Sequence, residues 1–364
     1  MAAGDHGWMS SLFSDREIAD LFSDAAQFAS FARFEQALIK GLAQAKLIGT
    51  TDAAGLIDRI AAFTPDSTAL EEAVLRDGVP APDYVRQLRA QVTGPGSELI
   101  HHGATSQDLV DTATIEALGK TGAILSKRLD DLLARLSALA ARDGGNRLQA
   151  VTRMQEALPF DVSARLASWQ QPLEDLRGRM TRLREQTRIL QFGGAVGGLQ
   201  ALGDNAALIA ETLARDLDLR WPGHSWHSAR GPMIAHANFL SELTGALGKI
   251  GQDIALMALR GEQDIHMSGG GSSSAMPHKQ NPVSAERLVA MARFNATLIS
   301  GMHQAQLHEM ERSGAAWMLE WMILPQMCQT AGASLTAASA LVRSIDRIGQ
   351  GTGDDAGQSM GDPR

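Results

Sequence analysis

The sequence contains a single cysteine, Cys328, among its 364 residues. One cysteine allows no internal disulfide and no cluster of thiolate metal ligands, which is typical of a protein from a reducing compartment, and we expect a cytoplasmic protein. Aromatic residues are also scarce, with ten Phe, six Trp and one Tyr. Because strand-rich proteins draw on aromatic and β-branched residues, this scarcity favours a helical fold.

Positive charge and long apolar runs are lacking as well. The formal net charge is −8, which argues against a nucleic-acid partner or binding to an anionic membrane. The N-terminus lacks the basic and apolar regions of a secretory signal. The most apolar stretch, 314–342, is interrupted by Glu320, Gln326, Gln329 and Thr330. It therefore predicts a helix buried in a helical core and not a membrane span.

Apolar residues recur at spacings of three and four over most of the chain, which predicts amphipathic helices. Prolines break the first 111 residues into shorter pieces, so residues 1–111 are predicted to form a small N-terminal helical domain. Residues 112–349 are predicted to form a long-helix bundle, and the polar, Gly-rich residues 350–364 a disordered tail. No stretch predicts a strand. The five long helices are expected at 112–142 and 160–191 and at runs that begin near Pro232, Pro282 and Gly314.

Residues 268–282 stand apart from this helical pattern. The run Ser-Gly-Gly-Gly-Ser-Ser-Ser-Ala-Met-Pro-His-Lys-Gln-Asn-Pro can be interpreted as a flexible Gly/Ser connector between helices. It is, however, longer than most helix connections. The helix expected from Pro282, with Asn281 as its cap, would also direct its free N–H groups toward this loop and form an anion site.

The same run resembles the Gly-Ser-Ser-x-Met-Pro-x-Lys-x-Asn signature of the fumarase/aspartase superfamily. The resemblance implies an all-α homotetramer in which each subunit adds five long helices to a twenty-helix core, with active sites where three subunits meet. It further implies that Ser274 is the catalytic base and that Lys279 and Asn281 bind a substrate carboxylate. Members usually continue into a C-terminal helical domain, which this chain is expected to lack. No cofactor is implied.

A second unusual segment runs from His101 to Asp108. Taken alone, it can be a turn before a helix, with Ser106 or Asp108 as the cap. It also resembles the His-x-Gly-x-Thr-Ser-x-Asp region of the adenylosuccinate lyase and carboxymuconate cycloisomerase branch. That resemblance implies that Thr105 and Ser106 hold a carboxylate and that His101 lies in the catalytic site. We expect no metal here, since the adjacent histidines have no carboxylate cluster at ligand spacing.

The third superfamily region corresponds to residues 152–159, where Arg153 replaces a histidine that acts as a general acid in the lyases. Arginine remains protonated at neutral pH, so it would clamp a carboxylate instead, with Gln155 beside it. A surface charge at a helix end is the alternative for Arg153. The Trp-His-x-x-Arg turn that ends at Arg230 and the Glu-Arg-…-Trp-x-x-Glu-Trp stretch in 309–321 resemble the cycloisomerase branch.

The resemblance to the cycloisomerase branch implies an enzyme that adds one carboxylate of a small tricarboxylate to a double bond of the same molecule. Ser274 and His101 are the predicted catalytic residues. The predicted substrate-binding residues are Thr105, Ser106, Arg153, Gln155, Arg230, Lys279 and Asn281. A β-eliminating lyase that releases fumarate is one alternative, and a non-catalytic helical scaffold that retains the fold is another.

Overall fold

In the computed structural model, the described residues are 7–272, 276 and 280–351, and within them α-helix predominates. The α-helices of this part are α1 Arg16–Asp20, α2 Asp24–Gln44, α3 Thr50–Ala61, α4 Ser67–Asp77, α5 Ala81–Gln91, α6 Ser106–Asp143, α7 Val162–Thr187, α8 Ala206–Asp216, α9 Gly231–Arg260, α10 Val283–Gln304 and α11 Ala315–Arg343. The 3-10 helices and strands are η1 Gly7–Leu12, η2 Ser97–Leu99, η3 Gln200–Asn205, β1 Arg147–Thr152, β2 Gln155–Asp161, β3 Ile265–Met267, β4 Gly271–Ser272, β5 Gln280–Asn281 and β6 Ile345–Ile348. The predicted all-α fold is confirmed.

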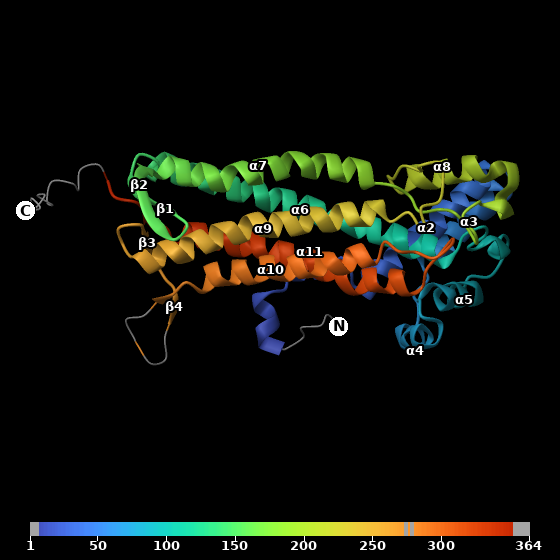
Figure 1. The fold of residues 1–364 in the computed structure, drawn as a ribbon. Helices are drawn as coiled ribbons and strands as arrows, with labels where there is room; N and C mark the ends of the chain where they lie inside the picture. The colour runs from blue at the N-terminus through green and yellow to red at the C-terminus, as the bar shows by residue number, and fades with distance from the viewer. Residues whose placement is uncertain (1–6, 273–275, 277–279, 352–364) are drawn as a thin grey trace, which may run out of the picture.

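The five longest helices, α6, α7, α9, α10 and α11, run side by side as an elongated bundle (Figure 1). In α6, Leu125, Leu129, Leu132 and Leu136 are at most 1% exposed, because their spacing places them on the face that the other helices cover. With 38 residues, α6 is about 57 Å long at 1.5 Å per residue. This length fixes how far apart the two ends of the bundle lie.

Helix α6 begins at Ser106 and not at Thr112, because Thr105 caps it. Thr105 and Asp108 form a capping box, in which the main-chain N–H of Thr105 donates to Asp108 Oδ2 at 3.0 Å. The interpretation of Ser106 or Asp108 as the cap is therefore wrong. The cap predicted for α10 is also wrong, because Pro282 occupies the N-cap position and Asn281 belongs to β5.

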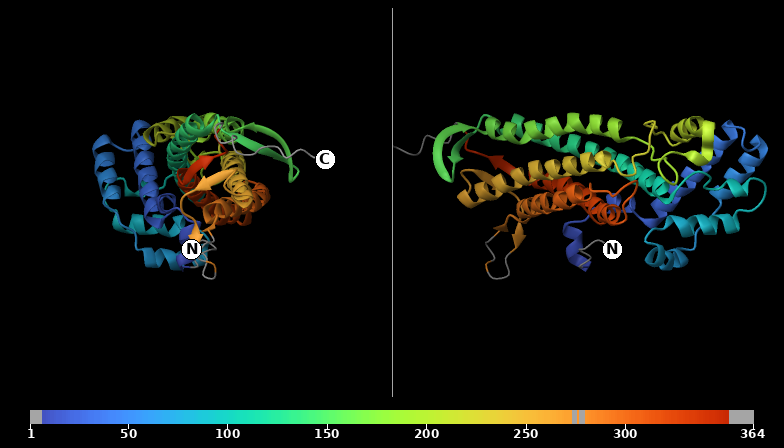
Figure 2. Two further views of the ribbon diagram at one scale, coloured as in Figure 1. Left: turned by 90° about the vertical axis from the view of Figure 1, so that its left-hand side faces the viewer. Right: turned by 45° about the vertical axis from the view of Figure 1, so that its right-hand side comes forward.

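The helix predicted from residue 160 begins instead at Val162, after an antiparallel hairpin that the sequence pattern did not predict. In this β1–β2 hairpin, Leu148 pairs with Phe160 and Gln149 with Pro159. A two-stranded ribbon tolerates Pro159 because a strand with a free edge does not need its missing N–H. The hairpin curves away from one side of the bundle when the helices are viewed end-on (Figure 2).

The N-terminal helices are built around a second apolar cluster. Phe31, Phe34 and Tyr84 lie at its centre, but Phe192 and Leu213 complete it from a much later part of the chain. Helix α8 packs directly on α2. The N-terminal unit thus shares its core with residues 190–214, while the domain limits at residues 111 and 349 stay a prediction.

Helix α11 lies within the bundle, as the sequence predicted for residues 314–342. Met327, Cys328 and Ala331 are fully buried between neighbouring helices. Burial raises the pKa of the Cys328 thiol, so this cysteine is an apolar core residue. No helix of the described residues is both long enough and apolar enough to cross a membrane.

His236 on α9 is expected to make the bundle sensitive to acid. Burial lowers the pKa of His236 to about 4, whereas an unfolded histidine titrates near 6.5. The unfolded chain then binds more protons between these values, so stability is complete above pH 6.5 and falls toward pH 4. The expected loss is about 3 kcal/mol across this window. It is measured as the unfolding free energy at pH 7 and at pH 4.5.

A His236→Leu variant should flatten this pH dependence, because leucine cannot take up a proton. Thr187 Oγ1, which lies 2.7 Å from His236 Nε2, would keep its hydrogen bond to the main-chain oxygen of Leu183 at 2.7 Å. The matched control is His303→Leu on α10, where the histidine is exposed. An unchanged slope in the His236→Leu variant would show that another group is responsible.

Candidate functional site

Several of the predicted site residues gather where α6 begins. Thr105 precedes the helix, Ser106 opens it, and His101 lies in the turn before it. The connection between α10 and α11 reaches this end as well, and Arg312 Nη1 donates to Thr105 Oγ1 at 2.6 Å. Arg312 forms no ion pair with the described residues, so its charge remains available to an anion.

His101 is contacted by the carboxylate of Glu35 on α2. Glu35 Oε1 lies 2.7 Å from the ring Nδ1, and Glu35 Oε2 accepts the main-chain N–H of His101 at 2.8 Å. The backbone of His101 has a φ of 58°, in the left-handed region. A non-glycine residue there costs about 1–3 kcal/mol, so the surrounding contacts must enforce the conformation.

A buried Asp–His pair joins the start of α6 to two glycine-containing loops. Asp108 accepts from His227 Nε2 at 2.8 Å and from the main-chain N–H groups of Gly193 and Gly194 at 2.9 and 3.0 Å. Gly194 has a φ of 66°, and a Cβ atom there would meet the main-chain oxygen of Gly103 at 2.6 Å. The Gly-rich loop can therefore approach the His101–Thr105 turn only because it lacks side chains.

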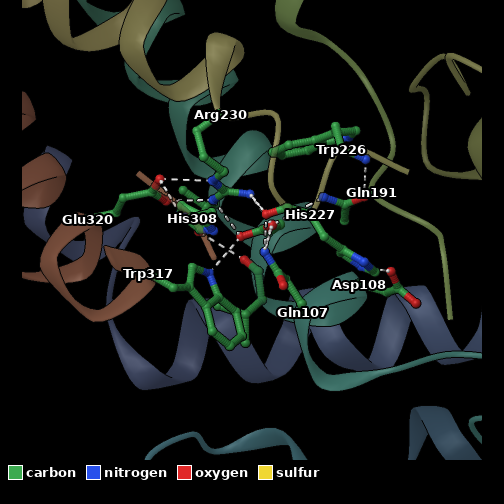
Figure 3. A network of polar contacts seen from close by, with 12 residues as sticks. Gln107, Asp108, Gln191, Trp226, His227, Arg230, His308, Trp317 and Glu320 are labelled. Atoms are coloured by element: carbon green, nitrogen blue, oxygen red, sulfur yellow. Dashed lines mark hydrogen bonds and ion pairs between the residues drawn. The ribbon is translucent and has the colours of Figure 1, made fainter. Parts of the chain in front are cut away.

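Arg230 lies in a network of buried polar groups beside this pair (Figure 3). Its guanidinium bonds Asp111 on α6 at 2.6 and 3.0 Å and Glu320 on α11 at 2.8 Å. Trp317 Nε1 donates to Asp111 Oδ1 at 2.9 Å, and the Trp226 ring lies 5.1 Å from the guanidinium carbon. The network ties α6 to α11 and so supports the connection that carries Arg312.

The prediction that Arg230 binds substrate is contradicted by this geometry. Its side chain is fully buried, and the two carboxylates occupy its donors. Burial opposes the charges of both Asp111 and Arg230, but their mutual attraction dominates, so the pKa of Asp111 is lowered and that of Arg230 is raised. The pair remains ionised, and Arg230 acts as an internal cross-link.

Other predicted residues lie at the opposite end of the bundle. Arg153 forms the hairpin turn together with Met154, with φ values of 49° and 64°, and Gln155 follows in β2, with all three side chains exposed. Asn281 pairs with Gly271 at the base of the Gly/Ser-rich segment 268–282, which we call the serine loop. Ser274 and Lys279 lie outside the described residues. An open pocket of about 750 Å³ adjoins this base.

A single chain thus brings His101, Thr105 and Ser106 together but holds them apart from Arg153, Gln155 and Asn281. The two groups lie at opposite ends of the bundle, which α6 spans (Figure 1). Among the described residues, no group of three or more His, Cys, Asp and Glu side chains could hold a metal ion.

Two residues that contact predicted site residues, Arg312 and Glu35, were not predicted from the sequence. Arg312 lies in the 309–321 stretch that resembles the cycloisomerase branch, but nothing in the sequence shows that it reaches Thr105. Glu35 follows Phe31 by four residues on the apolar face of α2. A carboxylate on an apolar helix face indicates a buried polar contact, since buried carboxylates require partners.

The chain is similar to a known family over most of its length. The profile of a family described as lyase matches residues 32–295. A 3-carboxy-cis,cis-muconate cycloisomerase of Pseudomonas aeruginosa is 34% identical, covering 90% of this chain and 72% of that protein. One of the same name from Acinetobacter baylyi is 33% identical, covering 92% and 75%.

Solved structures agree with these sequence matches. The 3-carboxy-cis,cis-muconate lactonizing enzyme of Pseudomonas putida superimposes with a TM-score of 0.86 at 32% identity, covering 93% of this chain and 77% of that one. A fumarate lyase of Mesorhizobium gives a TM-score of 0.85 at 28% identity, covering 93% and 76%.

Proposed function

The chain belongs to the lyase family within the fumarase/aspartase superfamily, and from this membership we propose that it is a 3-carboxy-cis,cis-muconate cycloisomerase of the cytoplasm. One carboxylate oxygen of the linear tricarboxylate adds to a double bond, and the neighbouring carbon takes up one proton, supplied in the net reaction by solvent. The product is 4-carboxymuconolactone. The similarity to cycloisomerases over nine-tenths of the chain carries this proposal.

Ser274 is the proposed proton-transfer group, and His101 is a second catalytic residue. A proton beside a carboxylate is exchanged through a charge-rich intermediate, which cations and oriented N–H groups stabilise. The proposed carboxylate ligands include Lys279. Asn281 of β5 and Arg153 and Gln155 of the hairpin are further proposed ligands, from the end of the bundle opposite the start of α6. No cofactor is required, because the attacking carboxylate and its acceptor belong to one molecule.

Thr105 and Ser106 are the proposed carboxylate ligands from the other end, and Arg312 joins them. Its guanidinium lies against Thr105 Oγ1 and forms no ion pair with the described residues. The N-terminal end of α6 adds a favourable dipole for an anion at this position. A substrate with three negative charges needs several such groups, even in a chain of net negative charge.

The active site is proposed to form in a homotetramer. Within one chain, the start of α6 and the β4–β5 pair lie at opposite ends of the bundle. Helix α6, which spans it, is about 57 Å long, far beyond the reach of one small substrate. Copies that pack side by side in opposite directions would bring the two ends together. A mass of four chains in analytical ultracentrifugation is the expected result.

The activity is tested directly with the purified chain. Loss of the conjugated-diene absorbance of 3-carboxymuconate is the expected result, with no release of fumarate from adenylosuccinate. Turnover of adenylosuccinate alone would indicate a β-eliminating lyase. Turnover of neither substrate by a folded tetramer would favour a structural role.

The Arg312→Gln variant is expected to bind substrate poorly. A hydrogen bond to a charged group contributes about 1.5–3 kcal/mol, so kcat/KM should fall about 10- to 100-fold, mainly through KM. Steady-state kinetics measure this change. The control is Arg177→Gln on α7, whose exposed pair with Asp130 lies outside the site. Equal kinetics in both variants would remove Arg312 from the substrate-binding set.

A further inference from the structure

Glu35 is a fully buried carboxylate, and its hydrogen-bond partners among the described residues belong to His101 alone. It lies on the inner face of α2 between Phe31 and Leu38, which are also 0% exposed. No lysine or arginine of the described residues pairs with it, and its ion-pair partner is His101. Burying a carboxylate without a cation is costly, so this position demands an explanation beyond packing.

Both oxygens of Glu35 are used on His101, but on different parts of it. Oε2 accepts the main-chain N–H, and Oε1 faces the ring Nδ1. Burial raises the pKa of Tyr84, and the negative charge of nearby Glu35 raises it further. The bidentate contact fixes the left-handed backbone at His101 and the orientation of its ring together.

The contact between Glu35 Oε1 and Nδ1 also determines which ring nitrogen of His101 carries the hydrogen. An ionised carboxylate only accepts hydrogen bonds, so Nδ1 must be the donor. In the neutral ring, Nε2 is then the nitrogen that carries no hydrogen. It forms no hydrogen bond with the described residues, and the side chain is 14% exposed. His101 lies in the turn that leads to Thr105 at the start of α6, so it belongs to the end of the bundle where a carboxylate site is proposed.

We propose that Glu35 is a positioning residue that locks His101 in the Nδ1-protonated form and presents Nε2 to the substrate. This inference rests on the proposed function, because it takes the α6 end as part of the cycloisomerase site. Glu35 itself touches no substrate. It acts through the tautomer and orientation of His101, as second carboxylates do for catalytic histidines in other enzymes.

The Glu35→Gln variant separates this role from simple packing. The amide keeps the shape of the side chain, and its oxygen can still accept the main-chain N–H of His101. Its NH₂ group then faces Nδ1, which must become an acceptor, so the hydrogen moves to Nε2. We expect kcat for 3-carboxymuconate to fall at least about 100-fold, with KM changed less than about 3-fold.

Two further variants complete the kinetic test. His101→Gln should be as impaired as Glu35→Gln, and the double variant no worse than His101→Gln alone, because residues that act as a unit are not additive. Glu116→Gln is the matched control, since Glu116 also bonds α2, through Ser30 Oγ at 2.8 Å, but does not contact His101. Additive losses, or wild-type kcat in Glu35→Gln, would overturn the proposal.

A chemical readout keeps this test independent of the activity. Diethylpyrocarbonate reacts with an unprotonated ring nitrogen, and peptide mass spectrometry gives the rate at His101. At pH 8, Nε2 of the wild type should react readily, and the Glu35→Gln variant should react at least about 5-fold more slowly. Loss of negative charge by itself would not slow this reaction. Unchanged carbethoxylation would refute the locked tautomer, whereas an inactive wild type with the expected carbethoxylation would refute only the proposed function.

Discussion

Replacement of Ser274 by alanine is expected to reduce kcat for 3-carboxymuconate by about 100- to 10,000-fold. This range is what a positioned proton-transfer group contributes to a reaction. KM should change little, because the proposed carboxylate ligands remain in place. Stopped-flow loss of the diene absorbance measures both constants.

The control for this variant is Ser268→Ala, at the start of the same segment. Ser268 is exposed, and its main-chain N–H donates to the main-chain oxygen of Ser344 at 2.8 Å, a bond that alanine retains. Both variants should show the same melting temperature as the wild type. Full activity in Ser274→Ala would mean that proton transfer belongs to another group.

The Arg230→Met variant is expected to lose about 3–5 kcal/mol of unfolding free energy. Methionine fills much of the space but leaves Asp111 and Glu320 buried without the guanidinium that pairs with both, which is the costly way to break a buried ion pair. Urea denaturation at one fixed chain concentration measures the loss, since assembly adds to apparent stability.

Arg179→Met provides the comparison, because its ion pair with Glu242 is about half exposed on both sides. Such surface pairs contribute about 0–1 kcal/mol. Similar losses in the two variants would mean that the Arg230 network is no more stabilising than a surface pair. Trp317 and Glu320 lie in the first two turns of α11, just after the connection that carries Arg312. We therefore also expect Arg230→Met to loosen the contact between Arg312 and Thr105.

Local spacing was enough to identify the helices of the bundle. The leucines of α6 and the interrupted apolar run of α11 predicted their own burial, because a helical repeat fixes which side chains share a face. The hairpin at 147–161 escaped prediction, since its pairing depends on residues on both sides of a turn. The Arg153–Met154 turn also contains neither the glycine nor the asparagine that would signal it.

The sequence by itself determined the fold class, the serine loop and the His101–Asp108 segment, because these depend on residue types at short spacing. Only the tertiary structure decided the partners of these residues. Glu35 meets His101 across 66 positions and Arg312 meets Thr105 across 207. The structure also turned Arg230 from a substrate ligand into a buried cross-link. Pairing between distant segments is set by packing, and no local pattern encodes it.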